Sequence, residues 1–258
     1  MKKIIFLFMA VTIFSLTTWS QESLKSDTLL SKLAKARELL MQGKNSEISQ
    51  ICLDIIKNHP DNKSAVQWWV IANMERSPDG EQKMESKLDS LGKVFPANTG
   101  IIFFKAFVQA EYGKNEEALS GFEKLVTLQP DSSVNWIGKG QISGALNRHE
   151  QAVAAFDKAI KLDPKRFDVY NMKAIELIRL GKYDEAIASL TKGIEIAPEF
   201  PVNFYNRACV YSLKGDKAHA LADLRQAFSM NPEFRQQAPK DEDLKSLWED
   251  EEFKNLLK

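Results

Sequence analysis

Three histidines and two cysteines are the residues of this 258-residue chain that could bind a metal ion or act as nucleophiles. His59, His149 and His219 are far apart, and no two of them have the four-residue spacing of helical zinc ligands. Cys52 and Cys209 form no C-x-x-C pair. The sequence also lacks a glycine-rich phosphate loop and a G-x-S-x-G turn. It therefore predicts no catalytic residue, no metal site and no cofactor.

The charged residues also give no indication of catalysis or of nucleic-acid binding. The acidic runs 241–243 and 249–252 are better explained as solvated surface than as paired acid–base groups. Lys plus Arg number 35 and Asp plus Glu number 35, so the chain carries no net positive charge to attract nucleic acid. An apolar content of 44% is enough to form a core. These features favour a non-enzymatic protein that does not bind nucleic acid.

The stretch 133–166 shows the element that organises the chain. Trp136 and Gly140 lie four residues apart and predict one face of a helix, while Ala152 and Phe156 predict the facing side of a second helix. A large residue opposite a glycine lets two helices approach closely. A proline ends the second helix, and prolines in step with it recur every 34 residues from the second of the series onward: Pro60, Pro96, Pro130, Pro164, Pro198 and Pro232.

Apolar columns recur with the same period. The small residues of the first helix are Ala36, Ala72, Ala106, Gly140, Ala174 and Ala208. The columns of the second helix are Ile48, Met84, Ala118, Ala152, Ala186 and Ala220, then Cys52, Leu88, Phe122, Phe156, Leu190 and Leu224. The turns between helices are expected to contain Gly43, Gly80, Gly113, Gly181 and Gly215.

This 34-residue helix–turn–helix pattern resembles the tetratricopeptide repeat. Six repeats are predicted within residues 29–234, with the bounds 29–62, 65–98, 99–132, 133–166, 167–200 and 201–234. The resemblance implies an all-α fold, an α-solenoid wound as a right-handed superhelix with the first helices inside. Lys63 and Ser64 are two extra residues between repeats, where we expect a longer turn.

The two ends of the chain differ from the repeats. Residues 1–20 have a basic start, a short apolar run and small residues before Gln21, the layout of a cleavable signal peptide followed by a linker, 21–28. The protein is then periplasmic or secreted, with no membrane span after cleavage; an uncleaved anchor is the alternative. Residues 235–258 predict short amphipathic helices that cap the last repeat, with a docking peptide as the alternative.

Helix caps and cysteines can also be placed. Asn98, Asn115 and Asp131 stand where N-terminal caps are expected, as does Asn45 or its neighbouring serine. The two cysteines fall in the first and sixth repeats, too far apart for a disulfide in a solenoid. Cys52 is expected to be buried, and Cys209 to lie partly exposed on the inner face.

The resemblance also assigns a concave binding surface to the first helices of the hairpins. A mostly apolar and aromatic lining predicts a groove for an apolar segment of a partner protein. The alternative is that some of these side chains pack onto adjacent helices. The candidate groove residues are Trp69, Asn73, Phe103, Phe107, Ile137, Gln141, Asn171, Ile175, Arg179 and Tyr205.

Tetratricopeptide proteins that grip a C-terminal carboxylate carry lysine at the fifth position of a first helix, and no repeat here has one, so binding of a chaperone C-terminus is disfavoured. The repeats, the leader and the lack of catalytic motifs together predict a protein–protein adaptor of the bacterial cell envelope. A self-associating structural oligomer and an accessory subunit of an envelope enzyme are the alternatives.

Overall fold

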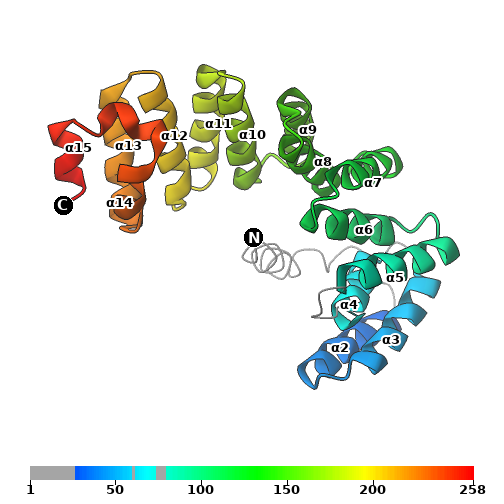
Figure 1. The fold of residues 1–258 in the computed structure, drawn as a ribbon. Coiled ribbons are helices and arrows are strands. Elements are labelled where there is room, and N and C mark those ends of the chain that lie inside the picture. The colour runs from blue at the N-terminus through cyan, green and yellow to red at the C-terminus, as the bar shows by residue number, and fades with distance from the viewer. Residues whose placement is uncertain (1–26, 60–61, 74–79) are drawn as a thin grey trace. The chain divides into compact units, whose positions relative to one another are not determined.

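The computed structural model describes residues 27–59, 62–73 and 80–258, with only the backbone described at 27, 28, 40 and 81. Throughout these residues the chain is helical, with no β-strand among them (Figure 1). The predicted signal peptide and residues 21–26 of the linker lie outside the described residues. The all-α fold class, built from tandem helical hairpins, is confirmed.

The chain divides into two compact units, and the first ends at Leu128. Its helices form three successive hairpins, and one apolar cluster that runs from Leu29 to Val108 joins the first five of these helices. Their bounds are α2 (Asp27–Met41), α3 (Asn45–Asn58), α4 (Lys63–Asn73), α5 (Gly80–Val94), α6 (Thr99–Glu111) and α7 (Asn115–Leu128).

The second unit begins at Gln129 and contains three more hairpins and the C-terminal segment. Figure 1 shows these hairpins packed side by side, so that each contacts its neighbour in sequence. Their bounds are α8 (Ser133–Ala145), α9 (His149–Leu162), α10 (Phe167–Arg179), α11 (Tyr183–Ile196), α12 (Pro201–Leu213) and α13 (Lys217–Met230). The C-terminal segment contains α14 (Phe234–Gln237), the 3-10 helices η2 (Ala238–Lys240) and η3 (Glu242–Leu247), and α15 (Glu251–Leu256).

The seams of the hairpins are made as the sequence predicts. A Cβ added to Gly140 of α8 would lie 2.6 Å from the ring of Phe156 in α9, so the glycine is needed for the close approach. Both second-helix columns named above are buried in every hairpin. Single hairpins bury little surface, and stacking supplies the rest of each core.

Most turns inside hairpins are three residues long and contain one residue with positive φ. Gly43, Gly113, Gly181 and Gly215 have φ between 69° and 80°, as expected for turn glycines. In repeat four, Asn147 occupies the corresponding turn position, with φ 58°. The expectation for Gly80 is wrong, because this residue is the first of α5 rather than part of a turn.

The second hairpin departs from the repeat pattern. Lys63 and Ser64 do not lengthen a turn, because α4 begins at Lys63 and includes both residues. The link before α4 comprises residues 59–62, as long as the links that precede α6 and α8. The two extra residues therefore start the helix earlier instead of separating two repeats.

N-terminal capping agrees with the sequence at one helix of the four. The side chain of Asn98 accepts a hydrogen bond from the Ile101 amide at 3.0 Å and caps α6. Asn45 and Asn115 are already inside their helices, and the residue before α8 is Ser132 rather than Asp131. Capping was predicted from residue type alone, and the residues that precede these three helices lie one or two positions away from the predicted caps.

Polar contacts join successive repeats within each unit. Glu85 of α5 accepts hydrogen bonds from Lys114 at 2.5 Å and from Gln109 at 2.9 Å, and the bond from Lys114 holds the pKa of Glu85 below its usual value. In the second unit, His149 Nδ1 lies 2.7 Å from Glu176 Oε2, which links α9 to α10.

The C-terminal segment packs over the sixth hairpin. Leu244, Leu247 and Phe253 are buried in one cluster with the core of α12 and α13. Arg225 of α13 pairs with Glu252 at 3.0 Å. The segment thus covers apolar surface of the last repeat with short helices whose outer faces are polar, which is the role of a solenoid cap.

Candidate interaction surface

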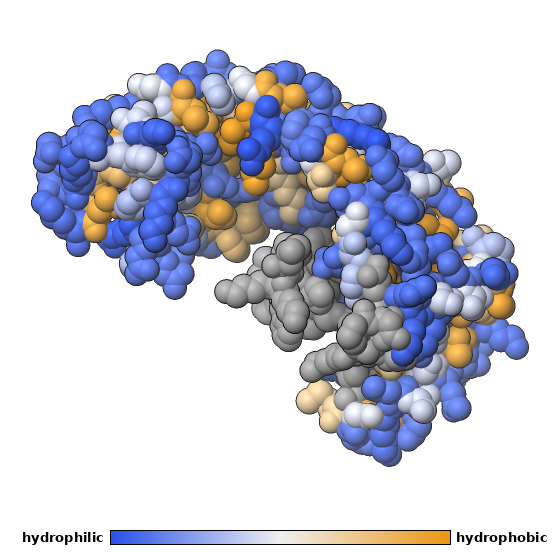
Figure 2. All heavy atoms as spheres, viewed as in Figure 1, coloured by the Kyte–Doolittle hydropathy of each residue, from blue (hydrophilic) through white to orange (hydrophobic). Residues whose placement is uncertain are grey.

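The candidate groove residues lie on first helices of the hairpins, as the resemblance implies, but they differ greatly in burial. Three of the ten are buried, five are half-buried, and two, Ile175 and Arg179, are exposed. The face seen in Figure 2 presents hydrophobic residues as separate patches within a mostly hydrophilic surface.

On α4, Trp69 is only 6% exposed. Asn73, one turn later, donates from Nδ2 to the Ser49 hydroxyl at 3.0 Å and to the Trp69 carbonyl at 2.8 Å. Its amide protons are therefore used to join α4 to α3. Neither side chain offers the free surface that a groove requires.

On α6, Phe103 and Phe107 are half-buried. The Phe103 ring packs edge-on against Phe104 and Phe122, with centroids 5.4 and 5.7 Å away, and the Lys63 ammonium lies 5.8 Å from its centroid. These aromatic contacts hold the ring in place while part of it remains accessible. Phe103 and Phe107 are the aromatic part of the candidate surface in the first unit.

On α8, Ile137 is 5% exposed and belongs to the core formed with Val169 of the next repeat. Gln141 is half-buried, and its Nε2 donates to the Met172 sulfur at 3.7 Å. This helix therefore directs its fifth position into the junction between repeats rather than toward solvent.

The inner face of α10 is the most open of the candidate positions in the second unit. Ile175 is 41% exposed, and Arg179 follows it by one turn and is also exposed. Asn171 is half-buried and fixed by a chain of amides. It donates to Asn203 Oδ1 at 2.8 Å and accepts from Asn206 Nδ2 at 3.2 Å.

On α12, the C-terminal segment covers Tyr205, which is 5% exposed. The Tyr205 hydroxyl donates to Asp241 at 2.9 Å, and its ring stacks on Phe234 with centroids 4.7 Å apart. Burial and this hydrogen bond raise the pKa of Tyr205 far above its usual value. Cys209 is also buried, so its expected partial exposure is wrong.

The expected apolar and aromatic lining of the groove must therefore be corrected. Trp69, Ile137 and Tyr205 are removed from the accessible surface, because neighbouring helices or the C-terminal segment pack over them. The side chains that remain accessible are Phe103 and Phe107 in the first unit and Ile175 and Arg179 in the second. Their role in binding stays a prediction.

An ion pair that the sequence did not predict joins the two helices of the sixth repeat and is tied to the fifth. Arg207 of α12 binds both oxygens of Asp223 in α13, at 2.7 and 2.8 Å, and also donates to the Thr191 hydroxyl of α11 at 2.9 Å. Asp223 raises the pKa of Arg207 above its already high value. Asp223 is an acidic residue within an apolar helix face, and this feature of the sequence could have predicted a buried ion pair.

Among the described residues, no group of three histidine, cysteine or acidic side chains is placed to hold a metal ion. Burial raises the pKa of Cys52 to about 12, which keeps this thiol protonated and unreactive.

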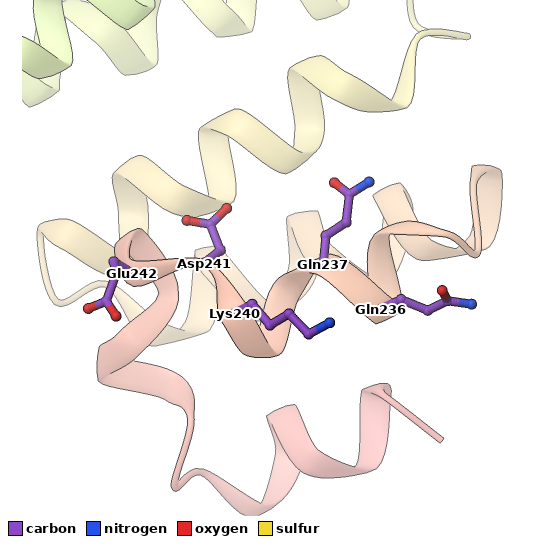
Figure 3. A pocket seen from close by; sticks show the side chains of 5 residues that line it. All are labelled: Gln236, Gln237, Lys240, Asp241 and Glu242. Carbon is purple, nitrogen blue, oxygen red and sulfur yellow. The ribbon is translucent and has the colours of Figure 1, made fainter. Parts of the chain in front are cut away.

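A shallow depression of about 560 Å³ lies on the C-terminal segment. Figure 3 shows that Gln237 and Asp241 point to one side of the segment, whereas Gln236, Lys240 and Glu242 extend in other directions. Asp241 is already engaged by Tyr205. Because the side chains do not converge, the depression does not form a centre for catalysis.

Comparisons with known proteins agree with the repeat geometry. Two tetratricopeptide-repeat family profiles match the chain, one over residues 155–188 and the other over residues 135–166 and 203–234. No curated protein matches the sequence. The matched ranges coincide with repeats four to six, where the sequence pattern is also clearest.

Solved structures with a similar fold are distant in sequence. MamA from Desulfovibrio magneticus RS-1 (residues 41 to the end) aligns with a TM-score of 0.60 at 13% identity, covering 67% of this chain and 97% of that one. Another MamA structure gives 0.58 at 20% identity, covering 62% and 94%. YrrB, described as a tetratricopeptide-repeat protein with an unusual peptide-binding site, gives 0.58 at 18% identity, covering 74% and 98%. At these identities the similarity establishes the fold alone.

None of the helices in the described residues combines the length and the apolar character needed to cross a bilayer.

Proposed function

Because the chain is a tetratricopeptide-repeat protein, we propose that it is a non-enzymatic scaffold that binds an apolar segment of a partner protein on the inner face of its hairpins. The exposed inner face of α10 is the observation that carries the proposal. Ile175 leaves 41% of its surface exposed beside the charged Arg179. Exposed apolar side chains next to an ordered polar group are typical of protein-binding surfaces.

The amide chain on this face supports a recognition role. Asn203 is fully buried and anchors Asn171, which in turn orients Asn206 at the half-buried edge. An amide that is held in one orientation loses little entropy when it binds, and it can bond a peptide backbone. The surface therefore joins an apolar contact with preformed hydrogen-bonding groups.

Site-specific photo-crosslinking in living cells tests the proposal. A photoreactive residue at Ile175 is expected to capture a defined protein, whereas the same residue at the exposed Ala188 of α11 is the matched control. Once the partner is purified, Ile175→Asp should weaken its binding about tenfold or more, because it buries a charge in an apolar contact. Equal capture at both positions, or unchanged affinity of the folded variant, would refute the inner-face site. Light scattering on the purified chain separates this scaffold from a self-associating oligomer.

We also propose that the protein is exported to the periplasm or secreted. The support is the basic, apolar and small-residue order of residues 1–20. Mass spectrometry of the protein recovered from cells is expected to find Gln21 at the N-terminus. An intact N-terminus on a membrane-bound protein would instead identify an uncleaved anchor.

A further inference from the structure

The inner face of α6 carries one acidic side chain that has no ionic partner in the described part of the chain. Glu111 is half-buried and is the last residue of α6, two turns after Phe103 and one turn after Phe107. Residues four apart share one face of a helix, so Glu111 continues the aromatic part of the candidate surface. The repeat pattern does not require an acid here, because the equivalent residues in the other repeats are Met41, Ser77, Ala145, Arg179 and Leu213.

No cation among the described residues neutralises Glu111. The nearest cation in the sequence, Lys114, instead pairs with Glu85 at 2.5 Å. Burial raises the pKa of the Glu111 carboxyl, and no charged neighbour contributes to that shift. A cation nearby would lower this pKa, so none of the described cations lies within reach. Partial desolvation of a carboxylate without a counter-ion is unfavourable, and an arriving cation would remove that cost.

The Glu111 carboxylate is accessible to a ligand. It accepts no hydrogen bond from the described residues, and its oxygens are not buried. A guanidinium can donate two parallel hydrogen bonds to one carboxylate, and it also stacks on aromatic rings, as an ammonium does less well. Glu111 and the neighbouring Phe107 ring therefore favour an arginine side chain over a lysine side chain.

Phe103 indicates where the apolar part of such a ligand lies. The Lys63 ammonium is 5.8 Å from the centroid of the Phe103 ring, so a second cation is disfavoured there. At a rise of about 1.5 Å per residue, Phe103 and Glu111 are about 12 Å apart along α6. An extended chain covers that length in about three to four residues. The surface thus fits an arginine at one end of a short extended segment and an apolar residue at the other.

We propose that the inner face of α6 binds a basic–apolar segment of a partner protein in an extended conformation. An arginine of this segment pairs with Glu111 and lies on the Phe107 ring, and an apolar side chain about three to four positions away packs on Phe103. The inference rests on the proposed scaffold function, and it concerns a surface of the first unit that does not include α10.

Selection from a random peptide library on the purified full chain tests the chemistry of the partner. Peptides recovered on wild type are expected to be enriched in arginine with an apolar residue about three to four positions away. The same selection on Glu111→Gln is expected to lose the arginine enrichment, because the attracting charge is gone. Glu117→Gln is the matched control, since Glu117 is an exposed residue of α7 outside the candidate surface. Circular dichroism confirms that both variants are folded.

Fluorescence anisotropy with one recovered peptide then tests the pairing directly. Glu111→Gln is expected to weaken binding about tenfold or more, because a hydrogen-bonded charge pair is lost. Replacement of the peptide's arginine by citrulline keeps the shape but removes the charge, and it should weaken binding to wild type by a similar factor. Citrulline should cause no further loss in Glu111→Gln, since the partner of the charge is already absent. Ile175→Asp is expected to bind the peptide as wild type does.

Each other outcome contradicts the inference. Recovery of no peptide, or of acidic or purely apolar peptides, would overturn the assignment of an arginine. Equal losses in Glu111→Gln and Glu117→Gln, or a citrulline effect that persists in Glu111→Gln, would overturn the site. Weakened binding in Ile175→Asp with wild-type binding in Glu111→Gln would place the peptide on α10, which would refute this inference while supporting the proposed scaffold function.

Discussion

Removal of the Arg207 side-chain charge is expected to destabilise the last two repeats strongly. Arg207 is the only cation that the structure shows in contact with Asp223, whose side chain is 9% exposed. The Arg207→Met variant keeps an unbranched apolar side chain but deletes the guanidinium, whose central carbon lies 5.9 and 6.0 Å from the ring centroids of Phe204 and Tyr211. Asp223 would then be a buried carboxylate without a counter-ion.

The size of the effect follows from burial and geometry. Breaking a buried ion pair by removing one partner costs about 3–5 kcal/mol, because the remaining charge stays desolvated. Arg207 is 17% exposed, which places the expected loss near the lower end, about 3 kcal/mol. Arg207→Lys keeps the charge but loses the two-point geometry, so we expect a loss of about 1–2 kcal/mol.

Hydrogen exchange is the suitable assay, because the global unfolding of repeat arrays is not always two-state. The free energy of opening is measured at the amides of α12 and α13, where the pair is located. Arg225→Met is the matched control on α13. Its pair with Glu252 is 57% and 54% exposed, so its loss should cost less than about 1 kcal/mol.

A second variant identifies the cause of the loss. In Arg207→Met/Asp223→Leu the unpaired carboxylate is gone, and opening should return to within about 1 kcal/mol of wild type. If Arg207→Met costs no more than Arg225→Met, the pair does not stabilise the junction. If the double variant is no better than Arg207→Met, the loss comes from packing and the charge argument is wrong.

Three further predictions concern other sites. Gly140→Ala should destabilise the fold by about 1–3 kcal/mol, because the new Cβ would lie 2.6 Å from a buried phenylalanine ring. Gly92→Ala has 3.7 Å to its nearest neighbour and should stabilise the fold by up to about 1 kcal/mol. Urea denaturation of both variants measures the difference. Glu85→Gln should cost about 1 kcal/mol at neutral pH. Since the pKa of Glu85 is lowered in the folded state, the gap between wild type and variant should close as pH falls through that pKa, which urea denaturation across an acid pH series measures. Asn147→Gly should raise the melting temperature slightly, by relieving a left-handed backbone at φ 58° worth about 0.5–1 kcal/mol.

The hairpins could be predicted because each one repeats the same local rules. Small residues on the first helix and apolar columns on the second helix are sufficient to predict where the two helices of a hairpin pack together. The close packing of Gly140 against Phe156 shows this directly. Repeat period and proline position then give the helix order. Helix starts were less accurate, because a capping residue is chosen by backbone conformation as well as by residue type.

The accessible surface could not be predicted in the same way. The fifth position of a first helix is covered when the following repeat packs over it, as at Ile137. An apolar residue type is the same whether the side chain lines an exposed groove or is buried between two helices, so residue type does not distinguish the two. At Tyr205 the covering element is the C-terminal segment, whose Asp241 also accepts a hydrogen bond from the tyrosine hydroxyl. Burial at this position depends on how far the next helix reaches, which is a property of two repeats together.

The second hairpin shows where such local failures gather. Its first helix starts two residues early, its two helices do not pack closely on each other, and the buried Trp69 Nε1–H group has no acceptor among the described residues. Each departure has an energetic cost, since a closed seam would bury more apolar surface and a buried donor without an acceptor is destabilising. Departures of this kind arise from how two neighbouring helices meet, which the residue types of one repeat do not determine.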